Sequence, residues 1–348
     1  MRILAYADVQ ATEGHERLFS DPTVPLQRWR VQRFYTRIAE ICDEMGCQAV
    51  WDLGDTTDDR AAIPVHTLNT IAEGIARLPS SPWNLKLIGN HEQTVKSTEI
   101  NTGVLYSPKF KVITGREKIQ LRRGVTVVAV SFPENDRELA VWLNEILAHR
   151  QASEKFVLIG HFQVSGAAMN SGVSLDGVPL SILKPFGVGM LGHVHKGQAL
   201  IADIHYVGSP FQQNFGESAD TKRVAIFDTD TLKIEWVSMD ACFPEYRTVT
   251  VDEFASQDAQ GEDRLAVVLR NPKEAEHFYS HPLSPRAASL ACQYDLTPSP
   301  QSASPDQLVT PQAILKRFVQ LNPPANGDIV ISDDDMVDFG LQIAGVTE

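Results

Sequence analysis

Short runs of β-branched and aliphatic residues along the first 240 positions constrain this chain more than any other sequence feature. Each run is long enough for a buried strand and too short for a core helix. Helical patterns separate the early runs, most clearly from Leu26 to Met45, before Gly46 as a C-cap. This alternation predicts an α/β fold of layered sheets and helices. The predicted strands are Ile3–Ala7, Ala49–Leu53, Leu85–Ile88, Val125–Val130, Phe156–Ile159 and Gly189–Leu191.

The pattern changes after residue 199, where strands follow one another without helices between them. Apolar runs at Ala199–Val207, Arg223–Phe227 and Leu232–Val237 predict antiparallel hairpins that complete a sandwich. This first unit spans residues 1–240.

The rest of the chain predicts smaller pieces. Residues 244–297 contain two strand patterns and one helical pattern, which indicate a small α+β domain. Residues 298–310 are rich in Pro and Ser and predict a linker. Residues 311–348 predict two short helices, and such helices gain stability by laying an apolar face in a partner's groove or, as the alternative, on this chain's own surface. The predicted partner-binding residues are Ile314, Leu315, Phe318, Val319, Met336, Val337 and Leu341.

Charge and composition exclude several classes of protein. The chain has 31 basic and 44 acidic residues, a net charge of −13, which argues against wrapping nucleic acid by bulk electrostatics alone. Its four cysteines form no Cys-x-x-Cys pair, so we expect neither a zinc knuckle nor a disulfide framework. The N-terminus has no signal-peptide core and no apolar run reaches membrane length. We therefore expect a cytoplasmic protein that does not enter a membrane.

Polar motifs directly follow five of the predicted strands. The carboxyl ends of neighbouring strands in a layered α/β fold open onto one crevice, so these side chains are expected to converge. They supply carboxylates, carboxamides and imidazoles without any thiolate, a donor set that suits a pair of manganese, magnesium, iron or zinc ions. The motifs are Asp8-Val9-Gln10, Gly54-Asp55, Gly89-Asn90-His91-Glu92, Gly160-His161 and Gly192-His193-Val194-His195.

The charge of such a site predicts its chemistry. Two divalent ions carry +4, whereas Asp8 and Asp55 supply −2, so the site would attract a phosphate anion. Two metals can lower the pKa of a bridging water and stabilise the attacking and leaving oxygens of an in-line displacement. The sequence therefore predicts hydrolysis of a phosphoester.

Each motif taken alone also has a purely structural explanation. A single Gly-Asp or Gly-His pair occurs by chance, and isolated histidines usually contact solvent or pack in a core. All five motifs in this order, each after a strand, favour the metal site instead. The histidines that we interpret as solvated or packing residues are His66, His149, His205, His277 and His281.

At these motifs, residues 1–240 resemble the calcineurin-like metallophosphoesterases, whose pattern is Asp-x-His, Gly-Asp, Gly-Asn-His-Asp/Glu, Gly-His and Gly-His-x-His. The segment from Tyr206 to Glu217 resembles the Tyr-x-Gly-Ser-Pro…Phe-x-Glu segment of SbcD-type DNA repair and recombination nucleases, which are related to the meiotic-recombination nucleases. The small cap domain and apolar C-terminal helices also resemble nuclease subunits of tailed phages and bacteria. The resemblance implies a four-layer α/β/β/α sandwich with a DNA-capping α+β domain.

The resemblance implies a role for each matching residue. Asp55 would bridge two metal ions, and His91 would contact the phosphate and assist the leaving group, with Asp58 where many relatives have a histidine. Manganese is the expected metal, with magnesium as the alternative. One metal would be held by Asp8, Gln10, Asp55 and His195, and the other by Asp55, Asn90, His161 and His193.

Gln10 departs from the family pattern, which has histidine at this position. A carboxamide oxygen is a harder and weaker donor than imidazole, so the first metal is expected to bind less tightly. His15 in the following loop is a candidate substitute ligand, although a solvated loop histidine is the simpler interpretation.

A local cluster of bases is the predicted DNA-binding surface. Phosphate contacts position a protein on DNA, and this stretch is the most basic part of an acidic chain. A solvated hairpin explains the same pattern equally well. The cluster consists of Lys109, Lys111, Arg116, Lys118, Arg122 and Arg123.

We therefore interpret the chain as a two-metal DNA nuclease of the SbcD type, an exonuclease on double-stranded and an endonuclease on single-stranded DNA, in DNA repair and recombination. The resemblance implies a homodimer that works with an SbcC-like coiled-coil ATPase of the SMC family, in a bacterial or phage-infected cell. Two alternatives stay open. The chain could hydrolyse nucleotides or phosphoproteins, or could be a non-catalytic scaffold with this fold.

Overall fold

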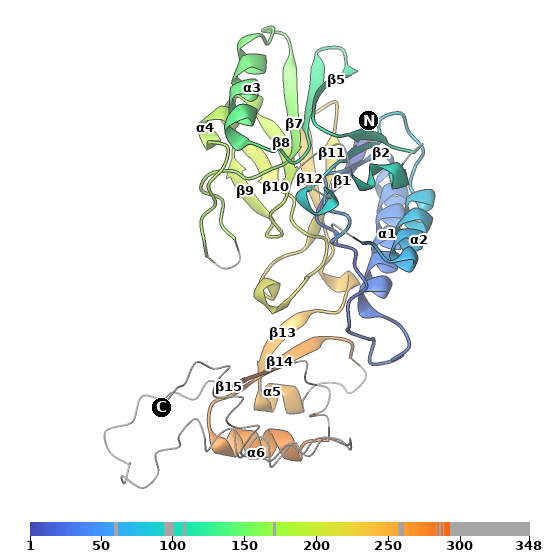
Figure 1. Cartoon of the computed structure of the whole chain (residues 1–348), viewed down its shortest axis with the longest axis vertical. Helices are drawn as coiled ribbons and strands as arrows, with labels where there is room; N and C mark the ends of the chain where they lie inside the picture. The colour runs from blue at the N-terminus through green and yellow to red at the C-terminus, as the bar shows by residue number, and fades with distance from the viewer. Residues whose placement is uncertain are drawn as a thin grey trace, which may run out of the picture. The chain divides into compact units, whose positions relative to one another are not determined.

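The computed structural model describes residues 1–58, 62–93, 101–106, 109–169, 172–256, 261–282, 284, 287 and 289–292, in which two six-stranded sheets lie face to face (Figure 1). The first sheet has the order β12-β11-β1-β2-β3-β4. Strands β1 to β4 run parallel, and β11 and β12 add an antiparallel edge. Its strands are β1 (Arg2–Tyr6), β2 (Cys47–Asp52), β3 (Leu85–Leu87), β4 (Lys111–Ile113), β11 (Arg223–Asp228) and β12 (Lys233–Ser238).

The second sheet has the order β5-β6-β7-β8-β10-β9, with a parallel centre of β6, β7, β8 and β10. An antiparallel strand closes each edge, β5 at one and β9 at the other. Its strands are β5 (Arg116–Arg122), β6 (Val125–Val130), β7 (Lys155–His161), β8 (Val188–Gly192), β9 (Gln198–Ile201) and β10 (Asp203–Tyr206).

The predicted strand Ala199–Val207 is wrong as a single element. The chain turns back at Ala202, whose φ is 51°, so that β9 and β10 form a tight hairpin. β10 then pairs parallel to β8, and not only within hairpins as expected. Asp203 is the single turn-forming residue at this point, and the apolar residues on both sides of it favoured one continuous strand.

Helices cover the outer face of each sheet and complete four layers. In β1, Ile3 and Ala5 point between the sheets, whereas Leu4 and Tyr6 pack under α1. Both faces of the strand are buried, which explains its continuous apolar run. The predicted four-layer α/β/β/α sandwich is confirmed. The helices are α1 (Leu26–Met45) and α2 (Val65–Arg77) on the first sheet, and α3 (Asp136–Ala148) and α4 (Leu180–Leu183) on the second.

Helix α1 has the predicted bounds, Leu26 to Met45. Gly46 ends it at a φ of 66°, and its N–H donates to the Cys42 carbonyl oxygen. Only glycine adopts this left-handed conformation without steric cost. In the part of the chain that the structure describes, no helix has the length and apolar character needed to cross a bilayer.

A separate parallel sheet follows the sandwich, with strands in the order β13-β14-β15 and a core of its own. Strand β13 ends at Thr250, because the Thr250 side chain accepts the Glu253 N–H and starts a helix that the sequence did not predict. The elements are β13 (Tyr246–Thr250), α5 (Val251–Ala255), β14 (Arg264–Leu269), α6 (Pro272–Ser280) and β15 (Ser289–Cys292).

Residues 1–292 form one compact unit. The predicted linker and C-terminal helices, with all seven predicted partner-binding residues, lie outside the described residues. The division at residue 240 into a nuclease domain and a capping domain stays a prediction.

Candidate metal centre

The polar motifs after the strands lie together where the two sheets meet. Asp8 and Asp55 follow β1 and β2, Asn90 follows β3, and His161 ends β7 in the other sheet. His161 Nδ1 donates to the Leu53 carbonyl oxygen at 2.8 Å and thereby ties the second sheet to the first. Segments more than a hundred residues apart in sequence therefore share one site.

The tightest group of candidate ligand atoms belongs to Asp55, His161 and His193, whose donor atoms lie within 4.8 Å of one another. His161 Nε2 is 3.2 Å from Asp55 Oδ2 and 3.2 Å from Asn90 Oδ1. His193 Nδ1 is 2.8 Å from the same Asn90 oxygen. These four residues are the set that the sequence assigned to the second metal.

The charges around this group depend strongly on each other. Burial alone would lower the pKa of His161, but the neighbouring Asp55 carboxylate raises it to about 9. Burial and the charge on His161 lower the pKa of His193 to about 3. The Asp55 carboxylate and the two imidazoles are thus close enough to influence one another's pKa values.

The residues assigned to the first metal lie beside this group. Asp8 is buried and accepts the His193 N–H with both oxygens, at 3.0 and 3.1 Å. Burial raises the pKa of Asp8. Gln10 Nε2 donates to Asp55 Oδ2 at 3.2 Å. His195 and Asp8 do not belong to the group of Asp55, His161 and His193. His195 follows His193 by two positions in the chain, and Asp8 is hydrogen-bonded to the His193 N–H.

The oxygen of the Gln10 amide is placed as a ligand for a cation would be. Gln10 is 5% exposed, and its Oε1 is buried without a hydrogen-bond partner among the described residues. A buried polar atom without a partner is costly and calls for an ion, a water or a donor. With Asp8 and Asp55 nearby, the donor set fits a divalent cation bound by oxygen and imidazole nitrogen.

Backbone strain is concentrated at the same residues. The described chain has six non-glycine residues with positive φ, and four belong to the predicted ligand set. Such conformations cost about 1–3 kcal/mol each and cluster at functional sites. The four are Asp8 (56°), Gln10 (51°), Asp55 (55°) and His193 (98°).

Two motif glycines have different reasons to be glycine. Gly54 has a φ of 107°, and a Cβ there would also lie 2.4 Å from His161 Nδ1. Gly89 has an ordinary φ of −88°, but a Cβ there would lie 2.0 Å from Asp55 Oδ1. Gly54 therefore allows a sharp exit of the chain from β2, whereas Gly89 allows close packing of two ligand loops.

His91 lies at the open side of the centre. Its backbone N–H donates to Asp55 Oδ1 at 2.8 Å, and its Nδ1 lies 3.2 Å from Asp58 Oδ1. The hydrogen bond with Asp58 raises the pKa of His91. The side chain is 31% exposed, so it can reach a bound ligand. His15, the candidate substitute ligand, is exposed in the loop after Gln10.

A buried ion cluster that the sequence analysis missed supports the ligand loops. The Glu92 carboxylate accepts the N–H groups of Asp55 and Gly89 at 3.1 and 3.0 Å. Lys86 Nζ lies 2.7 Å from Glu92 Oε1 and 2.9 Å from Asp52 Oδ1, and none of these side chains is exposed. The position of Glu92 in the Gly-Asn-His-Glu motif could have indicated its role, whereas nothing in the sequence distinguishes Lys86 from an ordinary strand residue.

The predicted DNA-binding bases lie mainly on the edge strands β4 and β5. Several bond to acceptors of this chain: Lys109 Nζ donates to the Ala76 carbonyl oxygen, Lys111 pairs with Glu117, and Arg122 Nε donates to the Thr229 carbonyl oxygen. These contacts involve no residue of the metal centre. The DNA-binding assignment stays a prediction.

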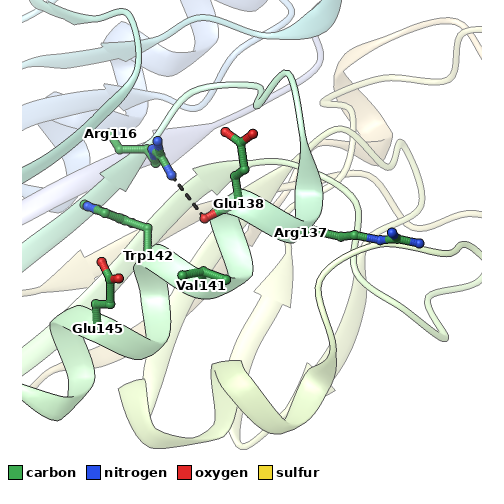
Figure 2. Close-up of a pocket in the computed structure, with 6 residues that line it drawn as sticks. All are labelled: Arg116, Arg137, Glu138, Val141, Trp142 and Glu145. Carbon is green, nitrogen blue, oxygen red and sulfur yellow. Dashed lines mark hydrogen bonds between the residues drawn. The ribbon is translucent and has the colours of Figure 1, made fainter.

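Arg116 also lines a surface pocket of α3 and β5, shown in Figure 2. Its guanidinium lies 5.5 Å from the centre of the Trp142 ring and donates to the Glu138 carbonyl oxygen. Two arginines and two glutamates line this pocket, so it has no net charge that would select a phosphate. Its lining residues are Arg116, Arg137, Glu138, Val141, Trp142 and Glu145.

Comparison with known proteins found one informative relative. The chain is 25% identical over 191 residues to exonuclease subunit 1 of Enterobacteria phage T4, a match that covers 53% of this chain and 54% of that protein. The chain thus spans about half the length of the curated relative that it matches. No family profile matches the chain. The match confirms the predicted resemblance to nuclease subunits of the phage type.

Solved structures resemble the chain only weakly. An archaeal phosphodiesterase has a TM-score of 0.34 and 9% identity, covering 68% of this chain and 99% of its own. A dimetal phosphatase from Danio rerio has a TM-score of 0.39 and 12% identity, covering 69% and 99%. A calcineurin-like phosphoesterase from Bacillus subtilis has a TM-score of 0.38 and 12% identity, covering 68% and 88%.

Proposed function

We propose that this protein is a metal-dependent phosphodiesterase that cuts DNA. The convergence of unlike donor side chains from five strand ends, with the Gln10 Oε1 atom left without a partner, is the observation that carries the proposal. Similarity to a phage exonuclease subunit supports the choice of a nuclease over other phosphoesterases.

Two divalent cations suit the donor set. Asp8, Gln10, Asp55 and His195 would hold the first, and Asp55, Asn90, His161 and His193 the second, with Asp55 shared. Manganese is the metal we propose, with magnesium as the alternative, because hard oxygen donors outnumber the imidazoles and no thiolate is present. When bound, such a pair activates a water for attack on phosphorus and stabilises charge on the phosphate oxygens.

The protein's own groups supply the rest of the chemistry. The Asp55 backbone is held by Glu92, and its side chain receives hydrogen bonds from His91 N–H and Gln10 Nε2, so the proposed bridging carboxylate has little freedom to move. A ligand that is held in place before binding loses less entropy on binding. The carboxylates of Glu92 and Asp52 flank Lys86, whose charge partly compensates theirs and limits repulsion of a phosphate.

His91 would contact the phosphate that is being cleaved. Asp58 holds the ring by its Nδ1 atom, which leaves Nε2 directed away from this contact. The raised pKa of His91 favours an imidazolium, which can donate a hydrogen bond to a phosphate oxygen or a proton to the leaving oxygen. Asp58 is therefore proposed as the residue that orients His91.

The substrate and partner follow from the family resemblance and the exonuclease match. We propose double-stranded DNA as the exonuclease substrate and single-stranded DNA as the endonuclease substrate. The nuclease would act in DNA repair or recombination with an SbcC-like ATPase, as a homodimer in the cytoplasm. Residues 244–297 would cap the DNA, and the basic residues from Lys109 to Arg123 would contact its backbone.

A direct assay tests this proposal. The purified chain is incubated with Mn²⁺ and labelled single- and double-stranded DNA, beside a nucleotide and a phosphomonoester. We expect cleavage of DNA, and loss of cleavage in Asp55→Asn and in His161→Ala, while circular dichroism shows that both variants stay folded. Cleavage of the small substrates alone would favour a different phosphoesterase, and no hydrolysis with two metals bound would favour a scaffold. DNA cleavage retained by both variants would contradict the site assignment.

A further inference from the structure

The segment that follows β10, from Val207 to Glu217, holds a buried carboxylate against a proposed metal ligand. Glu217 is 3% exposed, and its Oε1 atom lies 2.9 Å from His195 Nδ1. Its Oε2 atom accepts hydrogen bonds from Lys222 Nζ at 2.6 Å, Ser209 Oγ at 3.2 Å and the Gln213 N–H at 3.1 Å. One carboxylate thus collects four donors.

The same donors also hold the backbone of His195. Lys222 Nζ donates to the His195 carbonyl oxygen at 3.3 Å and to Ser209 Oγ at 2.8 Å. The Ser209 N–H donates to the same carbonyl oxygen at 3.0 Å. His195 is therefore held at its ring and at its main chain by one network of three side chains.

This arrangement selects one form of the imidazole. A carboxylate that already accepts a hydrogen bond from a buried ammonium acts as an acceptor, so His195 Nδ1 carries a hydrogen toward Glu217. The unshared electron pair of the neutral ring is then on Nε2, the nitrogen that a metal would use. Histidines that bind metals commonly donate their other N–H to a carboxylate, and loss of that partner weakens metal binding about 10–100-fold.

We propose that Glu217 is a positioning residue for the metal bound by Asp8, Gln10 and His195, and that Lys222 and Ser209 hold it in place. This inference rests on the proposed function, because it assumes that His195 binds a metal. It gives a physical reason for the spacing of Ser209 and Glu217 in the Tyr206–Glu217 segment. It also gives Glu217 a compensating role, because a well-oriented His195 would offset the weak carboxamide donor of Gln10 at the same metal.

The test is a titration of the full chain with Mn²⁺, in which electron paramagnetic resonance measures the free Mn²⁺. We expect two sites in the unaltered protein. In Glu217→Gln we expect about 10–100-fold weaker binding at the site of His195, which Glu217 contacts, and unchanged binding at the other site, to which His195 is not assigned. The matched control is Glu262→Gln, in which a carboxylate that accepts the Phe19 and Ser20 N–H groups is removed away from the centre. This control should bind both ions normally.

A double variant separates positioning from stability. Glu217→Gln leaves the buried Lys222 ammonium without its strongest partner and is expected to lower the thermal midpoint. Glu217→Gln with Lys222→Met removes that charge and should recover the midpoint, but not the affinity of the weakened site. If the single variant does not fold, the double variant carries the test.

The outcomes distinguish this inference from the proposed function. If the unaltered protein binds no Mn²⁺, the metal centre itself is wrong. If the unaltered protein binds two ions and Glu217→Gln binds both equally well, only the positioning role is wrong. Recovery of affinity together with stability in the double variant would also overturn the inference, since it would make Glu217 a structural residue.

Discussion

At the scale of single residues, Gln10 stands where the calcineurin-like pattern has histidine, and its contacts define the environment of this exchange. Its amide nitrogen donates to Asp55 while its amide oxygen stays without a partner. A histidine at this position would offer one imidazole nitrogen in place of that oxygen. The backbone, with a φ of 51°, suits histidine, which is enriched among residues with positive φ.

We therefore expect Gln10→His to raise the affinity of the first metal site without changing its formal charge, because imidazole is the stronger donor. Isothermal titration with Mn²⁺ measures the change, and the affinity of the second site provides an internal control. Equal or weaker binding at the first site would count against Gln10 as a ligand. That result would indicate that other groups of the loop, such as His15, already complete the site.

His91→Ala tests a residue that contacts the ligand set without belonging to it. Its backbone N–H, which bonds to Asp55, is kept in the variant. We expect both metals to bind and the cleavage rate to fall about 10²–10³-fold, as for removal of one donor that stabilises a transition state. Metal analysis and single-turnover kinetics measure the two quantities separately. Loss of a bound metal in this variant would refute the assigned role.

At the scale of secondary-structure elements, the cluster of Asp52, Lys86 and Glu92 joins the ends of β2 and β3 to the turn that carries Asn90. Burial by itself would lower the pKa of Lys86, but the charges on Asp52 and Glu92 raise it. The lysine therefore stays an ammonium and balances two buried carboxylates. Removing one member of a buried ion cluster leaves the remaining charges uncompensated and lowers the stability of the fold.

Lys86→Met is expected to destabilise the metal-free protein by about 3–5 kcal/mol, because it leaves two buried carboxylates without their cation. Urea unfolding in the presence of a chelator measures this change without a contribution from bound metal. The matched control is Lys111→Met, which removes an exposed ion pair with Glu117 and should cost at most about 1 kcal/mol. Similar losses in both variants would contradict a special role for the buried cluster.

The basic residues on β4 and β5 have a structural explanation at this scale. Both strands are sheet edges, and charged side chains on an edge discourage pairing with other chains. Ion pairs and main-chain acceptors already engage Lys109, Lys111 and Arg122. Contact with DNA would have to compete with these bonds.

At the scale of the whole molecule, the C-terminal residues are proposed to bind a partner and not to support catalysis. The residues assigned to the metal centre all belong to the unit of residues 1–292. The apolar residues from Ile314 to Leu341 lie outside the described residues, so their role rests on the sequence pattern. This separation leads to a prediction about a truncated chain.

Truncation after residue 305 should leave Mn²⁺-dependent DNA cleavage by the isolated chain intact and eliminate binding to an SbcC-like ATPase. A nuclease assay and a pull-down with the purified ATPase measure the two properties on the same preparation. The full-length chain with Asp55→Asn is a useful control, because it should lose cleavage and keep the partner. Partner binding by the truncated chain, or its failure to fold, would reject a separate partner-binding tail.

Local patterns alone determined several features of this protein. The period of α1 and the left-handed Gly46 need only neighbouring residues, so the sequence predicts the helix with its correct bounds. Apolar runs with both faces buried likewise mark the central strands, and polar residues after them mark the edge where the site lies. These features depend on backbone conformation and local spacing, which the sequence encodes directly.

Tertiary structure decided what depends on distant partners. The turn at Ala202 has only Asp203 as a local signal within an apolar run, and pairing of β10 with β8 depends on the completed sheet. Lys86 and Lys222 look like ordinary polar residues in the sequence, yet each is buried against a carboxylate that supports the ligand set. A buried charge is stable only beside a partner, and the fold alone brings the two together.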